Sequence, residues 1–121
     1  MLINLSNHPL TSWSRKQLIM AEQSYDEVID LPFPRISPKA ETEEILHLAR
    51  LYVKKCVAIL KQSNKKTNAV HIMGELTFTF HLVRLLKDKG VTCIASTTKR
   101  NVIENGNIKT TLFDFVRFRE Y

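Results

Sequence analysis

A continuously apolar segment that passes into a glycine and then into a helical pattern restricts the folds open to this chain. Residues 69–73 read Ala-Val-His-Ile-Met, which is typical of a central parallel strand covered on both faces. Gly74 follows directly, and apolar residues after it recur at helical spacing. A strand joined to a helical crossover is the unit from which parallel sheets are built. The junction therefore predicts an α/β protein.

Other segments supply the remaining strands. Short strands are expected over residues 2–5, 28–29 and 91–95, and Asn105-Gly106 predicts a tight turn that returns residues 111–118 antiparallel to a sheet edge. With helices between the strands, the connections should be right-handed crossovers. The expected architecture is a Rossmann-like three-layer sandwich, with a mostly parallel sheet and an antiparallel C-terminal edge hairpin. One domain is expected to span residues 1–121.

Three helices are expected, each with an apolar face toward the sheet. The first should begin at Thr11 or Ser12, the second at Ser37-Pro38, and the third after Gly74, ending at Gly90. The residues expected to be buried, helix by helix, are Trp13, Gln17, Met20, Ala21 and Ser24; Ile45, Leu48, Ala49, Tyr52, Val53, Cys56, Ile59 and Leu60; and Leu76, Phe80, Val83 and Leu86.

Composition limits the classes of partner. Apolar residues make up 44% of the 121 residues and charged residues 25%, which indicates a folded globular chain. Eighteen Lys and Arg against twelve Asp and Glu give a net charge of +6, which favours anionic partners. No apolar run approaches the roughly 20 residues that span a bilayer. Cys56 and Cys93 are expected to be buried thiols in a reducing cytoplasm.

Polar residues follow three of the predicted strands. After residues 2–5 come Ser6, Asn7 and His8, where the histidine could serve as an acid or base or be an ordinary solvated loop residue. After residues 91–95 come Ser96-Thr97-Thr98-Lys99-Arg100, whose hydroxyls and cations suit a phosphodiester better than a merely solvated edge. Ligands of open α/β sheets bind beyond the carboxyl ends of the strands. The sequence thus predicts one anion-binding site there.

The third strand end is open to two interpretations. Gly74 has no Cβ and could let a sugar or phosphate approach the helix start, but it could equally serve only a tight strand-to-helix turn. Glu75 would repel a phosphate, but its carboxylate could accept a hydrogen bond from a ribose hydroxyl or an adenine amino group. It could equally serve only to place a negative charge at the positive end of the helix dipole. Thr77 could face the crevice or bond to its own backbone.

These segments together resemble the small stand-alone CRISPR-associated Rossmann-fold (CARF) proteins of type III systems, especially the single-domain ring-nuclease-like members. The resemblance is carried by the segments Asn7-His8-Pro9-Leu10-Thr11, Gly74-Glu75 with Thr77, 95–100 and 115–119. It implies a cytoplasmic antiviral defence protein that forms a homodimer or a larger assembly. It also implies a ligand, a cyclic oligoadenylate and most often cyclic tetra-adenylate, held across the two-fold axis.

The resemblance further implies a mechanism without a metal or other cofactor, in which a ribose 2′-hydroxyl attacks its neighbouring phosphate in line. Lys99 and Arg100 would stabilise the phosphorane, and Thr97 and Thr98 would position the phosphate. The ribose or leaving oxygen would contact Ser6, Asn7 and His8, with His8 grouped among the catalytic residues, and adenosine would contact Gly74, Glu75 and Thr77.

Three functions remain in competition. The first is a ring nuclease that switches off the type III CRISPR signal, and the second is a binder that sequesters the ring or serves as a sensor subunit. The third, direct binding of DNA or RNA through the charge of +6, ranks last because no helix-turn-helix, zinc-finger or paired-aromatic pattern is present. Neither a membrane nor DNA is expected as a partner.

Overall fold

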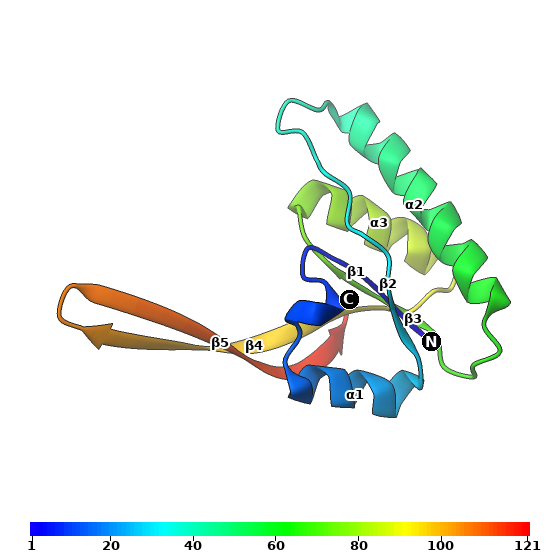
Figure 1. Ribbon diagram of the computed structural model, residues 1–121. Coiled ribbons are helices and arrows are strands. Elements are labelled where there is room, and N and C mark those ends of the chain that lie inside the picture. The colour runs from blue at the N-terminus through cyan, green and yellow to red at the C-terminus, as the bar shows by residue number, and fades with distance from the viewer.

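The computed structural model describes all residues, 1–121, and has a five-stranded sheet between helical layers (Figure 1). The strands are β1 (Leu2–Ser6), β2 (Val28–Asp30), β3 (Ala69–Met73), β4 (Cys93–Asn105) and β5 (Ile108–Glu120), in the order β2-β1-β3-β4-β5. The first four are parallel and β5 is antiparallel to β4. The predicted α/β class, with its antiparallel C-terminal edge, is confirmed.

One helix covers one face of the sheet and two helices cover the other (Figure 1). Helix α1 (Arg15–Tyr25) lies alone, opposite α2 (Thr42–Gln62) and α3 (Leu76–Asp88), and a short 3-10 turn, η1 (Leu10–Ser12), precedes α1. The chain leaves β1 toward β2 through α1 and returns through α2 to β3 on the other side of β1. The strand order therefore reverses between β1 and β3, which in such sheets opens a crevice.

Helix α2 buries the face that its periodicity predicted. Ile45, Ala49, Val53 and Cys56 are buried, and the other four predicted positions are partly buried against the same core. Its predicted start at Ser37-Pro38 was wrong, because those residues form a turn in which Ala40 N donates to Ser37 O and the helix begins only after Glu41.

The other two helices begin or face differently from the prediction. Helix α1 is capped by Ser14, not by Thr11 or Ser12, because η1 takes up those residues. It buries Ala21 and packs Leu18 and Tyr25 against the sheet, in place of the predicted Met20 and Ser24.

Helix α3 buries Val83 and Leu86 as predicted, but its first turns are rotated relative to the predicted face. Leu76 and Phe80 were expected in the core but are 82% and 62% exposed, whereas Phe78 and Leu82 are fully buried. The ring of Phe78 packs edge-on against Phe33, with 5.2 Å between centroids. That contact, together with the cap at the helix start, sets the rotation of the helix.

The largest departure concerns β4, which was predicted to end at Ala95 but continues to Asn105. It pairs with β5 along its whole length, with a bulge at Thr97/Thr98. Gly106 adopts φ 62° in the turn, as the Asn-Gly pair predicted. Residues 97–114 form a two-stranded arm that extends well beyond the helical layers (Figure 1), and "the arm" below means these residues.

Candidate functional site

The three predicted strand ends meet at one edge of the sheet. Ser6 at the end of β1 is in register with Met73 at the end of β3, and Asn7 N donates to Met73 O at 3.0 Å. Ser96 N on β4 donates to Met73 Sδ at 3.3 Å. The carboxyl edge therefore brings together segments that lie far apart in the sequence, at the point where the strand order reverses.

A cavity of about 450 Å³ opens at this edge on the α1 side of the sheet. Its size falls within the range of roughly 300–1,000 Å³ that is usual for small-ligand sites. The residues that line it are His8, Ser12, Trp13, Gln17, His71, Met73, Ser96, Thr98 and Phe113. They come from the loop after β1, from η1 and α1, and from β3, β4 and β5.

A buried network of side chains forms the floor of the cavity. The Asn4 amide nitrogen donates to His8 O at 2.9 Å and to Asp30 Oδ1 at 2.8 Å, which fixes the orientation of the amide. Asn4 Oδ1 is therefore the acceptor that faces Ser6 Oγ at 2.8 Å and His71 Nδ1 at 2.9 Å. Because an amide oxygen only accepts, His71 Nδ1 must carry the ring proton.

This tautomer determines how Ser96 is oriented. The unprotonated Nε2 of His71 lies 2.8 Å from Ser96 Oγ and accepts its proton, while Gln17 Nε2 donates to the same Ser96 oxygen at 2.9 Å. His71 is 1% exposed, and burial, followed by the nearby charge of His8, lowers its pKa from 6.5 to about 4. The ring is neutral at pH 7 and is a weak base. Its role is to hold Ser96 and Gln17 in place.

Two of the predicted residues, His8 and Thr98, line this cavity. Asn7 is exposed at the same edge. Ser6 was expected to contact ligand, but it is buried and bonded to Asn4 and to the His8 backbone. Ser6 thus supports the floor from beneath.

Gly74 is explained by packing. A Cβ at this position would lie 2.2 Å from Cζ of Phe33, whose ring covers the glycine. Of the two interpretations left open by the sequence, the geometry favours the tight strand-to-helix turn, because Phe33 occupies the space through which a ligand would approach.

Glu75 and Thr77 are engaged with each other at the start of α3. The Glu75 carboxylate accepts from Thr77 N at 3.1 Å and Phe78 N at 2.7 Å, and Thr77 Oγ1 donates to it at 2.8 Å. The bond from Phe78 N is the main reason why the pKa of Glu75 is lowered. The carboxylate occupies the place at this helix N-terminus where an external anion would bind.

Lys99 and Arg100 lie within β4, although the sequence predicted that this strand ends before them, at residue 95. Both are exposed on the arm, and they point to opposite faces because side chains alternate along a strand. Arg100 is directly opposite Phe113, which lines the cavity, so Arg100 shares that face. Lys99 lies opposite Asp114 on the other face, together with Thr97, whose hydroxyl donates to Arg117 O at 3.0 Å. The predicted phosphate site is therefore divided between two faces.

Several lining residues were missed by sequence reasoning. Trp13 and Gln17 were assigned to the buried face of α1, and Phe113 to an edge strand. Trp13 is buried, and its indole nitrogen donates to His8 O at 3.0 Å, which anchors the loop after β1. The one available signal was Gln17, because an amide on an otherwise apolar helix face requires a polar partner.

A comparison with protein families shows where the chain belongs. The profile described as "Uncharacterized protein MJ1673 family" matches residues 1–119, nearly the whole chain. This chain belongs to the MJ1673 family. Searches of curated proteins and of solved structures returned no match. In this MJ1673-family chain no helix has the length and apolar character needed to cross a bilayer. Both cysteines, Cys56 and Cys93, are free, and both are buried, as predicted.

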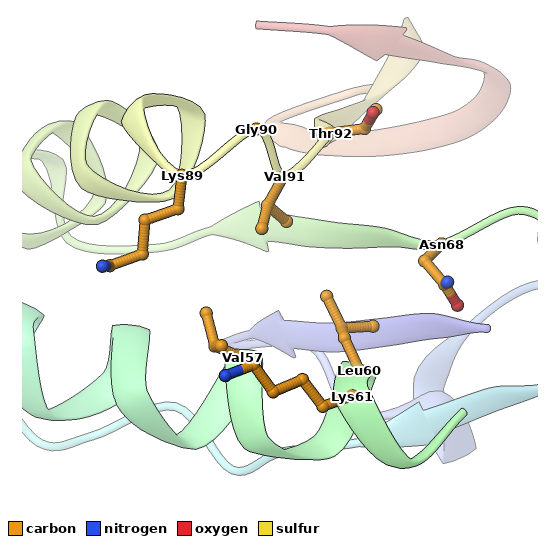
Figure 2. Close-up of a pocket in the computed structure, with 8 residues that line it drawn as sticks. All are labelled: Val57, Leu60, Lys61, Asn68, Lys89, Gly90, Val91 and Thr92. Atoms are coloured by element: carbon orange, nitrogen blue, oxygen red, sulfur yellow. The ribbon is translucent and has the colours of Figure 1, made fainter. Parts of the chain in front are cut away.

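A second cavity, of about 480 Å³, lies at the opposite, amino-terminal edge of the sheet. Figure 2 shows Val57, Leu60 and Lys61 of α2 on one side of it and residues 89–92 on the other. Lys61 and Lys89 lie at helix C-termini, where a positive charge complements the helix dipole. Because ligands of open α/β sheets bind at the carboxyl edge, the cavity above the His71 network is the stronger candidate.

Proposed function

We propose that this protein binds cyclic oligoadenylate, most often cyclic tetra-adenylate, at the carboxyl edge of its sheet and degrades it without a metal, thereby switching off type III CRISPR signalling. The observation that carries the proposal is the cavity above the His71 network. It combines hydroxyl and amide groups with an aromatic ring, and an exposed arginine lies on the same face. Phosphate, ribose and base each require one of these groups.

The cavity offers a separate contact for each part of a nucleotide. Phe113 is 65% exposed and presents a ring face on which a base can stack. Ser96 and Gln17, both held by the network, offer hydrogen bonds within the cavity. The planar guanidinium of Arg100 can form two parallel hydrogen bonds to the oxygens of a phosphodiester. The net charge of +6 raises the rate of encounter with a polyanionic ring.

The proposed cleavage requires mainly positioning and charge stabilisation. A ribose 2′-oxygen forms a bond to the adjacent phosphorus, the bond to the 5′-oxygen breaks, and the products end in a 2′,3′-cyclic phosphate and a 5′-hydroxyl. The proton of the 2′-hydroxyl leaves and the 5′-oxygen gains one, and His8 at the cavity rim is the group placed to exchange them. Arg100 would stabilise the charge on the phosphorane. Lys99 points to the other face, and its part in the proposal is attraction of the ring.

The alternative within the same site is a binder that holds the ring intact. Labelled cyclic tetra-adenylate should be incubated with excess protein in EDTA, and the products separated by chromatography. Linear products with cyclic phosphate ends support the enzyme, whereas intact ring bound in a fixed ratio supports the binder. A protein that neither binds nor cleaves the ring contradicts the proposal.

Matched variants locate the activity. Arg100→Ala should weaken binding or cleavage at least tenfold, and Lys54→Ala, an equal loss of charge on the exposed face of α2, should have no effect. His8→Ala should slow cleavage more than it weakens binding. Equal effects of Arg100→Ala and Lys54→Ala would contradict this site.

A further inference from the structure

The arm leaves backbone hydrogen-bonding groups unpaired along its edges. The pairing of β4 with β3 stops at Ile94, so the outer edge of β4 is free from Thr97 to Asn105. No helix lies against this part of the hairpin (Figure 1). A free strand edge is a template for pairing with another strand.

The arm also exposes apolar side chains on both faces. Val102, Ile103, Ile108, Leu112 and Phe113 are between 44% and 68% exposed. A lone two-stranded hairpin is at best marginally stable in water, and contiguous exposed apolar surface marks an interaction site. The arm therefore has the features of an interface that is open in the single chain.

We propose that the arm pairs with the arm of a second copy of this chain, β4 against β4, antiparallel and centred on Val102. Two identical strands related by a two-fold axis perpendicular to the sheet form such a pair. Residues that are directly opposite in such a pair point to the same face of the sheet, so their numbers are both even or both odd. The pair must therefore be centred on one residue that lies opposite the same residue of the other copy. The free edge offers only a few residues that could be this centre.

Charge selects one of these centres. A pair centred on Arg100 or on Glu104 would place like charges opposite each other, which destabilises a strand pair. A pair centred on Asn101 or on Ile103 would leave both charges opposite uncharged residues. Only the pair centred on Val102 places Arg100 of each copy opposite Glu104 of the other, so that two ion pairs form by symmetry.

Contacts within the single chain favour the same register. Lys109 Nζ lies 3.4 Å from Glu104 Oε1, on the face that Arg100 shares. Arg100 of the second copy would approach the same carboxylate from the free edge, so that Glu104 would lie between two cations, Lys109 of its own chain and Arg100 of the other copy. Val102 would lie against Val102 of the second copy, between the two charged rows.

The register also places the tip of one arm beside the base of the other. Gly106 of one copy falls opposite Thr98 of its mate, at the rim of the cavity. The turn of the second copy, residues 105–107, would thus complete the rim. This inference goes beyond the proposed function. Arg100 would use one edge of its planar guanidinium for Glu104 of the other copy, and the remaining N–H donors would stay available to a phosphodiester.

A cysteine on the axis tests the register. In Val102→Cys, the new thiols would lie on residues about 4.5–5.5 Å apart at Cα, within disulfide range. Mild oxidation should convert most of the protein to a covalent dimer. The native thiols should not compete, because burial raises the pKa of Cys56 to about 12 and that of Cys93 to about 11. Thr110→Cys, exposed on β5 of the same arm, is the control and should stay uncross-linked.

A charge reversal supplies an independent test, read by sedimentation equilibrium. Arg100→Glu should weaken the dimer at least tenfold by placing Glu opposite Glu104, and adding Glu104→Arg should restore it. A wild type that stays monomeric at millimolar concentration overturns the proposal. Equal cross-linking of Val102→Cys and Thr110→Cys would also overturn it. The same holds if Arg100→Glu leaves the dimer dissociation constant unchanged, or if adding Glu104→Arg does not lower the dissociation constant of the Arg100→Glu dimer.

Discussion

Acidification from pH 7 to pH 5 should destabilise this protein through His71. The folded ring has a pKa of about 4, lowered first by burial and then by the charge of His8, against 6.5 for an unperturbed histidine. Below pH 6.5 the unfolded chain therefore binds a proton that the folded chain excludes. Stability from this residue is fully present above pH 6.5 and is lost as pH falls toward 4.

The size of the effect follows from the two pKa values. One pKa unit corresponds to about 1.4 kcal/mol, so the difference amounts to about 3 kcal/mol once both states are protonated. Between pH 6.5 and pH 4.5 the free energy of unfolding should fall by up to about 1.4 kcal/mol per pH unit. The lowered pKa of Glu75 adds a further loss only below its ordinary value of 4.5. Burial also lowers the pKa of the Met1 amino group from 8.0, and the loss that this adds below pH 8 is the same in the wild type and in a His71 variant.

Urea unfolding followed by circular dichroism at pH 5, 6, 7 and 8 measures this slope. His71→Asn keeps a donor for Asn4 Oδ1 but cannot titrate, so it should start less stable and show a much flatter dependence on pH. His47→Asn, on the exposed face of α2, is the matched control and should retain the wild-type slope. A wild type equally stable at pH 5 and pH 7, or a His71→Asn variant with the wild-type slope, would refute the reasoning.

Three further predictions concern stability, each measured by urea unfolding at pH 7. Leu82→Ala should cost about 2–5 kcal/mol because the side chain is fully buried, whereas Leu76→Ala, at an 82% exposed position of the same helix, should change stability by less than about 0.5 kcal/mol; similar losses would contradict the observed rotation of α3. Gly74→Ala should cost about 1–3 kcal/mol through its clash with the Phe33 ring, and the cost should shrink in a Phe33→Leu background; an undiminished cost there would mean that the ring is not the obstacle. Glu75→Ala should cost about 1 kcal/mol through loss of the cap, and an unchanged urea midpoint would show that the cap contributes nothing.

The sequence predicted α2 better than α3 for a physical reason. Most apolar residues on α2 fall on one stripe, and His47, Arg50 and Lys54 mark the opposite side of the helix, so the pattern could identify the buried face. Helix α3 begins Leu-Thr-Phe-Thr-Phe, with apolar side chains around much of its circumference, so periodicity alone could not choose the face. The choice came from Phe33, which packs against Phe78 from a distant loop.

The candidate site was also predictable only in part. Its place at the carboxyl edge followed from the strand pattern, because the ends of parallel strands converge. The separation of Lys99 and Arg100 onto opposite faces could not be predicted, because Thr97-Thr98-Lys99-Arg100 has the composition of a loop and becomes strand only through pairing with residues 113–117. The contacts of His71 with Asn4 and Ser96 likewise join three strands and leave no local pattern.

Fluorescence of Trp13 offers the most direct test that the cavity above the His71 network is the ligand site. Trp13 is the only tryptophan of the chain and forms part of the cavity wall. Titration with cyclic tetra-adenylate should change its emission saturably in the wild type, and the change should be lost in Thr98→Phe, whose ring obstructs the cavity. No binding by calorimetry, or binding that leaves Trp13 emission unchanged and survives Thr98→Phe, would contradict the assignment.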